Sequence, residues 1–408
     1  MLKYIWKNKV LLIIVLLAFW LVPNAIGLSE QSKTESIVTA IGVDKINGEY
    51  EVSLQYIVPS SNNTTEELKL ATQKGSTVGE AIESIKLQQG KLSGFAHCRF
   101  LAFNDEACKE NFIEVLDYLL RRKTNTNNIL LINTPDSAKE LLSISNKLDS
   151  DLYSFLNNTG SNNDLGEFHN LKTIGDYYEA YFGQVKCLAI NSVNVKTEKS
   201  QEEQSGDSGT SGNAQNSSDS GGTNKEKKKF ENKAIQVILK NDKKLITLTE
   251  QESDNLAWFN PEIKKDNFSI KNFNENNLQN AKVLFNVNNK ICTSKASFKN
   301  NQPHLKVNVK IYVRTGEVDS ENLQKKDYQV LQKKYSKELI NKMKEEIISN
   351  MKSAEKHFKE NNYDVINCFN NFYKFKNKEL KEYLKTNSKE DFIKNVIFDY
   401  NVEIIQNV

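Results

Sequence analysis

The chain has 408 residues, of which 38% are hydrophobic and 26% are charged, which is enough for two or three ordinary domains. Its formal net charge is +3. Since the first 27 residues hold three lysines and no acid, the remainder is close to neutral and lacks the basic excess of a nucleic-acid surface. Five scattered cysteines without a CxxC pair, with only four histidines, indicate neither a disulfide framework nor a metal site, and no cofactor is expected.

The first segment has the pattern of an export signal. Three lysines precede an unbroken apolar run over residues 10–22, and the small residues Ala25 and Gly27 follow it. A core helix of a cytosolic protein would show a polar face, and this run has none. We therefore expect residues 1–27 to be a signal peptide or an N-terminal membrane anchor, with the rest of the chain on the extracytoplasmic face of a bacterial membrane.

Residues 32–196 are expected to form an N-terminal α+β domain, because strand and helix patterns alternate along them. The clearest signal is a hairpin, in which the turn pair Asn47-Gly48 separates two strand-like segments. Thr77 and Glu80 then have the spacing of a helix capping box. The predicted elements are strands over 37–43 and 50–58, a helix from 77, a strand over 99–103, a helix over 105–122, a strand over 128–133, a helix from Asp136, a helical stretch over 166–182 and a strand over 185–195.

A polar segment over residues 197–229 divides the chain. It consists largely of Ser, Gly, Asn, Gln, Glu and Lys and has no apolar residue larger than alanine. Such a segment cannot bury enough surface to offset the entropy cost of ordering it. We therefore expect a disordered linker between the N-terminal domain and everything after Phe230.

Two further units are expected after the linker. Residues 230–270 are predicted to form a small middle domain, with strands over 234–239 and 245–248 and a helix that ends at Trp258, although such a unit is small for an independent core. Residues 271–408 are predicted to form a C-terminal α+β domain. Its elements are a strictly alternating strand over 305–313, a helix over 328–360, a helix over 369–384 and a strand over 396–404. The predicted fold class is therefore α+β and multidomain, with mixed sheets covered by helices and a disordered polar linker.

The reactive residues show no catalytic pattern. His97 and Cys98 are neighbours, but successive residues of a strand point to opposite faces, so the two would not share a proton. Asp44 flanks the predicted hairpin turn. No phosphate-binding glycine loop, GxSxG elbow or HExxH motif occurs. We expect no catalytic, cofactor-binding or metal-binding residues and no enzymatic activity.

Several stretches, in order, resemble the C-subunit family of bacterial spore germinant receptors (the Ger(x)C type, or GerAC-like). These are the opening hairpin, the segment around 97–99 with the helix after it, the unit over 234–258, and the part from 362 to the closing strand. The resemblance covers nearly all of the chain outside the linker. The matched positions are expected to be structural rather than catalytic, and they are Gly42, Asp44, His97, Cys98, Arg99, Arg121, Trp258 and Asp364.

The resemblance implies a non-enzymatic subunit that works beside two membrane-embedded partners, the A- and B-type receptor subunits. It would act on the outer face of the spore inner membrane, where nutrients trigger germination, and it would have no nucleic-acid partner. Family members usually carry a lipobox cysteine for lipidation. The first cysteine here is Cys98, so no lipid anchor is expected at the leader.

Two other functions are compatible with the sequence. An extracytoplasmic small-nutrient binding protein outside the germination pathway would need an aromatic-lined cleft. Its candidates are Tyr177, Tyr178, Tyr181 and Phe182, although their helical spacing favours core packing. A secreted hydrolase would use Cys98 or His97, and substituting either would then abolish activity rather than only lower stability.

Overall fold

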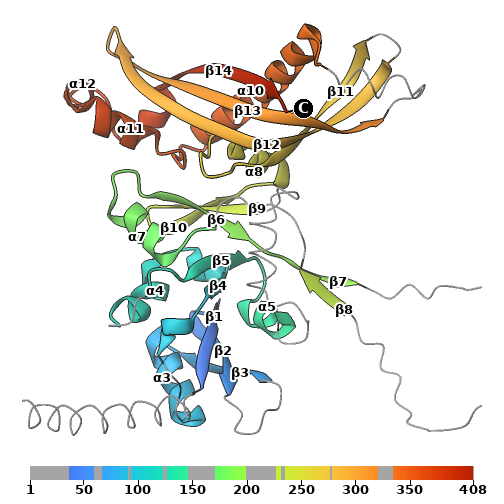
Figure 1. The fold of residues 1–408 in the computed structure, drawn as a ribbon. Helices are drawn as coiled ribbons and strands as arrows, with labels where there is room; N and C mark the ends of the chain where they lie inside the picture. The colour runs from blue at the N-terminus through green and yellow to red at the C-terminus, as the bar shows by residue number, and fades with distance from the viewer. Residues whose placement is uncertain are drawn as a thin grey trace, which may run out of the picture.

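The structure is a computed structural model that describes residues 36–58, 67–90, 92, 94–122, 126–145, 171–198, 227–230, 235–275, 278–319 and 334–407. Two large mixed sheets, each with helices packed against it, divide these residues into two halves (Figure 1). The predicted α+β architecture is confirmed. The expected leader over 1–27 lies outside the described residues. Among the helices that are described, none is long and apolar enough to cross a membrane.

The first sheet has a parallel centre with antiparallel hairpins at both ends. β1, β4, β5 and β6 run parallel, whereas β2, β3, β9 and β10 are each antiparallel to their neighbours. Asn47 and Gly48 form the β1–β2 turn with φ of 53° and 87°, as a tight hairpin requires, so the predicted turn is confirmed. In sheet order the strands are β10 (Lys243–Thr247), β9 (Ile235–Lys240), β6 (Cys187–Ser192), β5 (Leu130–Thr134), β4 (Phe100–Asn104), β1 (Ile37–Ile46), β2 (Glu49–Val58) and β3 (Glu67–Gly75).

Helices cover both faces of the first sheet. One face packs against α3, α4 and α7 around buried residues such as Phe103 and Phe112, and the other packs against α5. Thr77 caps α3 by accepting from the Glu80 amide at 3.1 Å, but Glu80 binds Ser76, so only half of the predicted capping box forms. The helices are α3 (Val78–Gln89), α4 (Ile113–Leu120), α5 (Ala138–Ser145) and α7 (Ile174–Phe182), with 3₁₀ turns η1 (Phe95–His97) and η2 (Glu106–Cys108).

The second sheet is built around a long hairpin. Strands β12 and β13 pair along most of their length, and Asn300 and Asn301 form their turn with φ of 50° and 62°. β11 is antiparallel to β12, and β14 is parallel to β13. A single core cluster joins this sheet to its helices, with α8 on the side toward the first half (Figure 1). The elements are α8 (Glu250–Ala257), β11 (Asp266–Glu275), β12 (Leu278–Lys299), β13 (Gln302–Asp319), α10 (Lys337–Glu360), α11 (Cys368–Phe375), α12 (Asn377–Tyr383), α13 (Phe392–Asn395) and β14 (Ile397–Gln406).

The residues expected to form a middle domain are shared between the two halves. β9 and β10 complete the first sheet, because β9 pairs with β6. In their connecting turn, Asp242 accepts from the Ile113 amide at 2.7 Å and from the Tyr177 hydroxyl, which ties the turn to α4 and α7. α8 and Trp258 instead pack in the core of the second half. Residues 235–258 therefore connect the halves rather than enclosing a core of their own.

Several predicted boundaries differ from the structure. β7 (Val195–Glu198) and β8 (Lys227–Phe230) pair as a ribbon, so both ends of the expected linker over 197–229 are strands, and residues 199–226 lie outside the described chain. The predicted helix over 105–122 is shorter because η2 precedes α4, and the predicted helix over 369–384 is two helices, α11 and α12. α10 begins only at Lys337, after its N-cap Ser336. β11 and β12 have no predicted counterpart.

Candidate functional site: the groove between the two sheets

Gly42 and Asp44 together hold α5 against the first sheet. The Asp44 side chain is buried and accepts from the Ala138 amide at 2.7 Å, the Lys139 amide at 3.0 Å and the Ser137 hydroxyl at 3.0 Å. Burial raises the pKa of this carboxyl, and its three donors oppose the shift. A side chain at Gly42 would place its Cβ 2.7 Å from Leu142 of α5. Asp44 therefore caps a distant helix and does not merely flank a turn.

Replacing Asp44 by alanine is expected to lower the free energy of unfolding by about 2 kcal/mol, because the amides of Ala138 and Lys139 lose a buried acceptor. Urea unfolding followed by circular dichroism measures the change. Replacing the exposed Glu345 by alanine is the control and should change stability by less than about 0.5 kcal/mol. Equal stabilities of the Asp44 variant and the original chain would contradict the capping role.

His97 ends the turn η1, and Cys98 and Arg99 follow it before β4, so His97 and Cys98 are not strand neighbours as predicted. The three residues do not form a nucleophilic site. Cys98 is 8% exposed and its thiol donates to the Phe100 carbonyl, whereas His97 lies exposed. Burial raises the pKa of the Cys98 thiol, and a nucleophilic cysteine needs the opposite shift. The Arg99 amide donates to the Thr39 carbonyl at 2.8 Å, which joins the start of β4 to β1.

Arg121 lies on the surface at the end of α4. Its guanidinium donates to both carboxylate oxygens of Asp117, at 2.9 and 2.8 Å, one turn earlier in the same helix. Both side chains are largely exposed, so the pair contributes little stability. Arg121 therefore lies apart from the buried motif residues.

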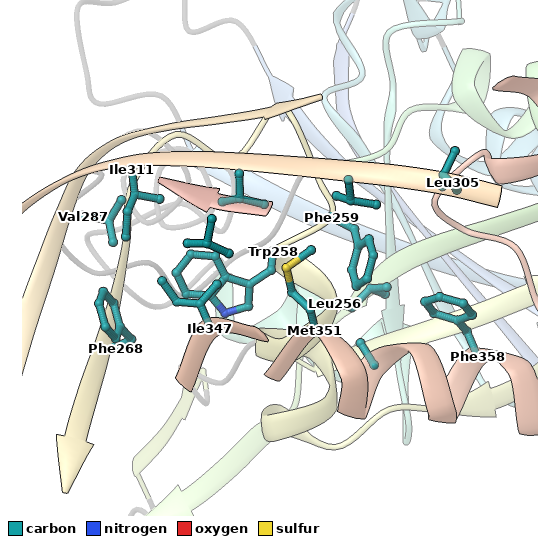
Figure 2. Close-up of a cluster of buried hydrophobic side chains, with 14 of the residues drawn as sticks. Leu256, Trp258, Phe259, Phe268, Val287, Leu305, Ile311, Ile347, Met351 and Phe358 are labelled. Carbon is teal, nitrogen blue, oxygen red and sulfur yellow. The ribbon is translucent and has the colours of Figure 1, made fainter. Parts of the chain in front are cut away.

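Trp258 lies in the core of the second half, directly after α8 (Figure 2). It is 3% exposed and packs edge-on against Phe268, with the ring centroids 5.9 Å apart. The fully buried Lys290 of β12 places its Nζ 5.4 Å from the Trp258 ring and donates to the Ala257 carbonyl at the end of α8. Burial lowers the pKa of Lys290 to about 8. Lys290 was not predicted as a notable residue, because the sequence did not predict β12 itself.

Asp364 lies between α10 and α11, where the second half meets the first. Its carboxylate accepts from the amides of Cys368 and Phe369, each at 2.8 Å, at the start of α11. Burial is the main influence on this carboxyl and raises its pKa to about 6. Beside it, Lys240 at the end of β9 donates to the Asn362 carbonyl. Asp364 therefore orders a loop that holds the two halves together.

A chain of polar contacts lies next to the Asp364 loop. Tyr363 is 2% exposed, and its hydroxyl lies 2.7 Å from His357 Nδ1. The other ring nitrogen of His357, Nε2, lies 3.1 Å from Glu252 of α8. Glu252 also forms a capping box with Thr249 at the start of α8. This chain of contacts joins α8, α10 and the Asp364 loop at the boundary between the halves.

Next to this boundary lies a groove with a volume of about 480 Å³, which both halves line. The first half contributes α7 and β6, and the second contributes the turn after α8, β12, β13 and the start of α11. Leu305 and Val307, each 1% exposed, belong to its apolar walls. Its polar lining residues are Lys172, Asp176, Glu179, Gln236, Asn260, Glu262, Ser294, Asn367, Asn370 and Asn371.

The aromatic residues considered for a cleft do not line this groove. Tyr177 is 3% exposed and packs edge-on against Phe112 at 5.2 Å and stacks on Tyr181 at 5.8 Å, inside the core of the first half. Phe182 is 76% exposed. The groove instead runs along the face of α7 that carries Asp176 and Glu179. Within the described residues, no group of three or more His, Cys, Asp and Glu side chains could hold a metal ion.

Sequence comparisons match two family models, and the second match includes β9 and β10 of the first sheet. A family model described as "Spore germination protein N-terminal domain" matches residues 30–195, and one described as "Spore germination B3/ GerAC like, C-terminal" matches residues 233–405. Among solved structures, the crystal structure of the GerBC protein is similar in fold, with a TM-score of 0.52 and 12% sequence identity. The match covers 92% of this chain and 99% of that one. A search of curated proteins found no match.

Proposed function

This chain belongs to the GerAC-like family of spore germination proteins, and from this we propose that it is the non-enzymatic C subunit of a nutrient germinant receptor. The observation that carries the proposal is the order of the two family matches, which together span both halves of the fold. In this proposal the subunit acts by contact with membrane-embedded A- and B-type subunits. Its place is the outer face of the spore inner membrane.

The parts of the chain have separate roles in this proposal. Residues 1–27 direct export and then either are removed or stay as a membrane anchor. The first cysteine, Cys98, lies too far along the chain for lipidation of this segment. The domains over 32–196 and 271–408 supply the contact surfaces, and residues 230–270 connect them. The motif residues support this arrangement through packing and capping, as Asp44, Trp258 and Asp364 do.

Deleting the gene in its native spore-former tests the receptor role. Spores that lack the protein should fail to lose refractility with one or more nutrients of a panel, and the intact gene should restore the response. Normal germination with every nutrient would overturn the proposal and favour a small-nutrient binding protein outside the germination pathway.

Contact with the partner subunits needs its own measurement. A tagged version of this protein, recovered from solubilised spore inner membranes, should bring with it the A- and B-type subunits that act in the same nutrient response. A deletion phenotype without such recovery would leave the germination role standing and overturn the contact mechanism.

A further inference from the structure

The groove between the sheets has an unequal charge distribution. Three carboxylates line it, Asp176, Glu179 and Glu262, against the single cation Lys172, which gives a formal charge of −2. Lys172 Nζ already lies 3.6 Å from Glu262 Oε2, so its charge is shared with one of the three. Asp176 uses one carboxylate oxygen, Oδ2, to cap α7, through Thr173. Glu179 lies exposed on the next turn of that helix.

Part of the lining is apolar. Its partly exposed members include Val185 and Ala189 of the first half and Val365 and Ile366 before α11, whereas Leu305 and Val307 of β13 are almost fully buried. An apolar group that enters from water would therefore be transferred onto hydrocarbon, which is favourable in proportion to the area buried. The volume of about 480 Å³ lies within the range of small-molecule sites.

We propose that this groove binds a small primary amine with an aromatic or aliphatic body. The body would lie against the apolar walls, and the ammonium group would donate to the rim carboxylates and to the amide oxygens of residues such as Asn260. A ligand whose only charge is a carboxylate would be repelled by a rim of net charge −2. Because both halves line the groove, the bound amine bridges them. This inference does not depend on the germination role.

Calorimetry on the purified full-length chain tests the ligand class with three compounds of one shape. These are phenethylamine, 2-phenylethanol and 3-phenylpropionate, which share a phenyl ring and differ in the charge of the head group. The expected result is saturable binding of phenethylamine, weaker binding of the alcohol and no binding of the carboxylate. Equal binding of all three, or binding of none, would overturn the proposal.

A pair of tryptophan substitutions tests the location. Ser294 is an exposed groove residue on β12, and its hydroxyl lies 3.1 Å from the Asn371 amide. Thr293 is the preceding residue of the same strand, is also exposed and points to the other face of the sheet. Ser294→Trp should fill the groove and abolish phenethylamine binding, whereas Thr293→Trp should leave it unchanged. Equal binding by both variants would overturn the proposed site.

A charge substitution tests the rim. The double variant Glu179→Gln and Glu262→Gln raises the formal charge of the lining from −2 to 0 without changing its shape. It should weaken phenethylamine binding roughly tenfold and leave 2-phenylethanol unaffected. The matched control removes two exposed carboxylates of α10, through Glu345→Gln and Glu346→Gln. It should change the affinity for neither phenethylamine nor 2-phenylethanol. Unchanged amine affinity in the rim variant would overturn the role of the carboxylates, and normal circular dichroism would show that the variant folds.

Discussion

Replacing Trp258 by alanine is expected to lower the free energy of unfolding of the second half by about 4 kcal/mol. The indole is 3% exposed within a continuous core, where Phe268 and Ile347 lie around it (Figure 2). Its removal leaves a cavity that the surrounding strands and helices fill only in part. It also removes the ring above which the buried Lys290 ammonium lies, so that a desolvated charge loses a favourable contact.

Urea unfolding followed by circular dichroism at 222 nm is the suitable measurement. Tryptophan fluorescence is not, because two of the three tryptophans, Trp6 and Trp20, lie within residues 1–27 and Trp258 is the one removed. Trp258→Phe should cost much less, since it keeps an aromatic ring in the core. The matched control is Phe182→Ala, which removes an aromatic side chain that is 76% exposed and should change stability by less than about 0.5 kcal/mol. If Trp258→Ala lowered the free energy of unfolding by as little as the control does, the core would have repacked around the missing indole and the prediction would be contradicted.

Replacing Asp364 by asparagine is expected to change how stability depends on pH. The pKa of this carboxyl is about 6 in the folded protein and near 3.8 when unfolded, so between these values the folded state holds a proton that the unfolded state has released. The contribution of Asp364 to stability is therefore greatest at low pH and falls as the pH rises toward 6, by up to about 3 kcal/mol. Asparagine does not titrate, and the variant should lack this decline.

The measurement compares the free energies of unfolding of the variant and the original chain from pH 4 to pH 7. The original chain should lose stability relative to Asp364→Asn as the pH rises. The free energy of unfolding of the variant is lowered by an amount that does not depend on pH. The asparagine side chain offers one acceptor oxygen to the two backbone amides of Cys368 and Phe369, where aspartate offers two. Asp319→Asn, at an exposed site, is the control and should produce no such difference. Parallel pH profiles for the Asp364 variant and the original chain would contradict the prediction.

The two halves share part of one hydrophobic core, to which Cys187 and Ile238 of the first sheet belong, and polar contacts near the groove also join them. Lys389 donates to Gln184 at 2.6 Å on one side, and Lys172 pairs with Glu262 on another. Near the Asp364 loop, Lys240 donates to the Asn362 carbonyl. A ligand that fills the groove would therefore bias the relative arrangement of the halves through its contacts with both. This gives the proposed amine site a physical route to influence the proposed contact surfaces.

Local structure follows directly from the sequence at several places. The β1–β2 turn is predicted by Asn47-Gly48, because these residues adopt positive φ at low cost. The inward face of β13 is predicted by the alternation from Leu305 to Val313. The family is likewise recognisable from the sequence, because two family models match residues 30–195 and 233–405. These features depend on residues that are close together in the chain.

Only the tertiary structure decides which distant segments become neighbours. Alternation shows which face of a strand is buried but carries no information on its partner, so the pairing of β9 with β6 was not predictable. Asp44 caps a helix 94 residues away, as its bond to the Ala138 amide shows, and its local position indicates only a turn. The groove likewise depends on Glu179, Glu262 and Leu305 meeting across the boundary of the halves, because it is long-range burial of both sheets that brings them together.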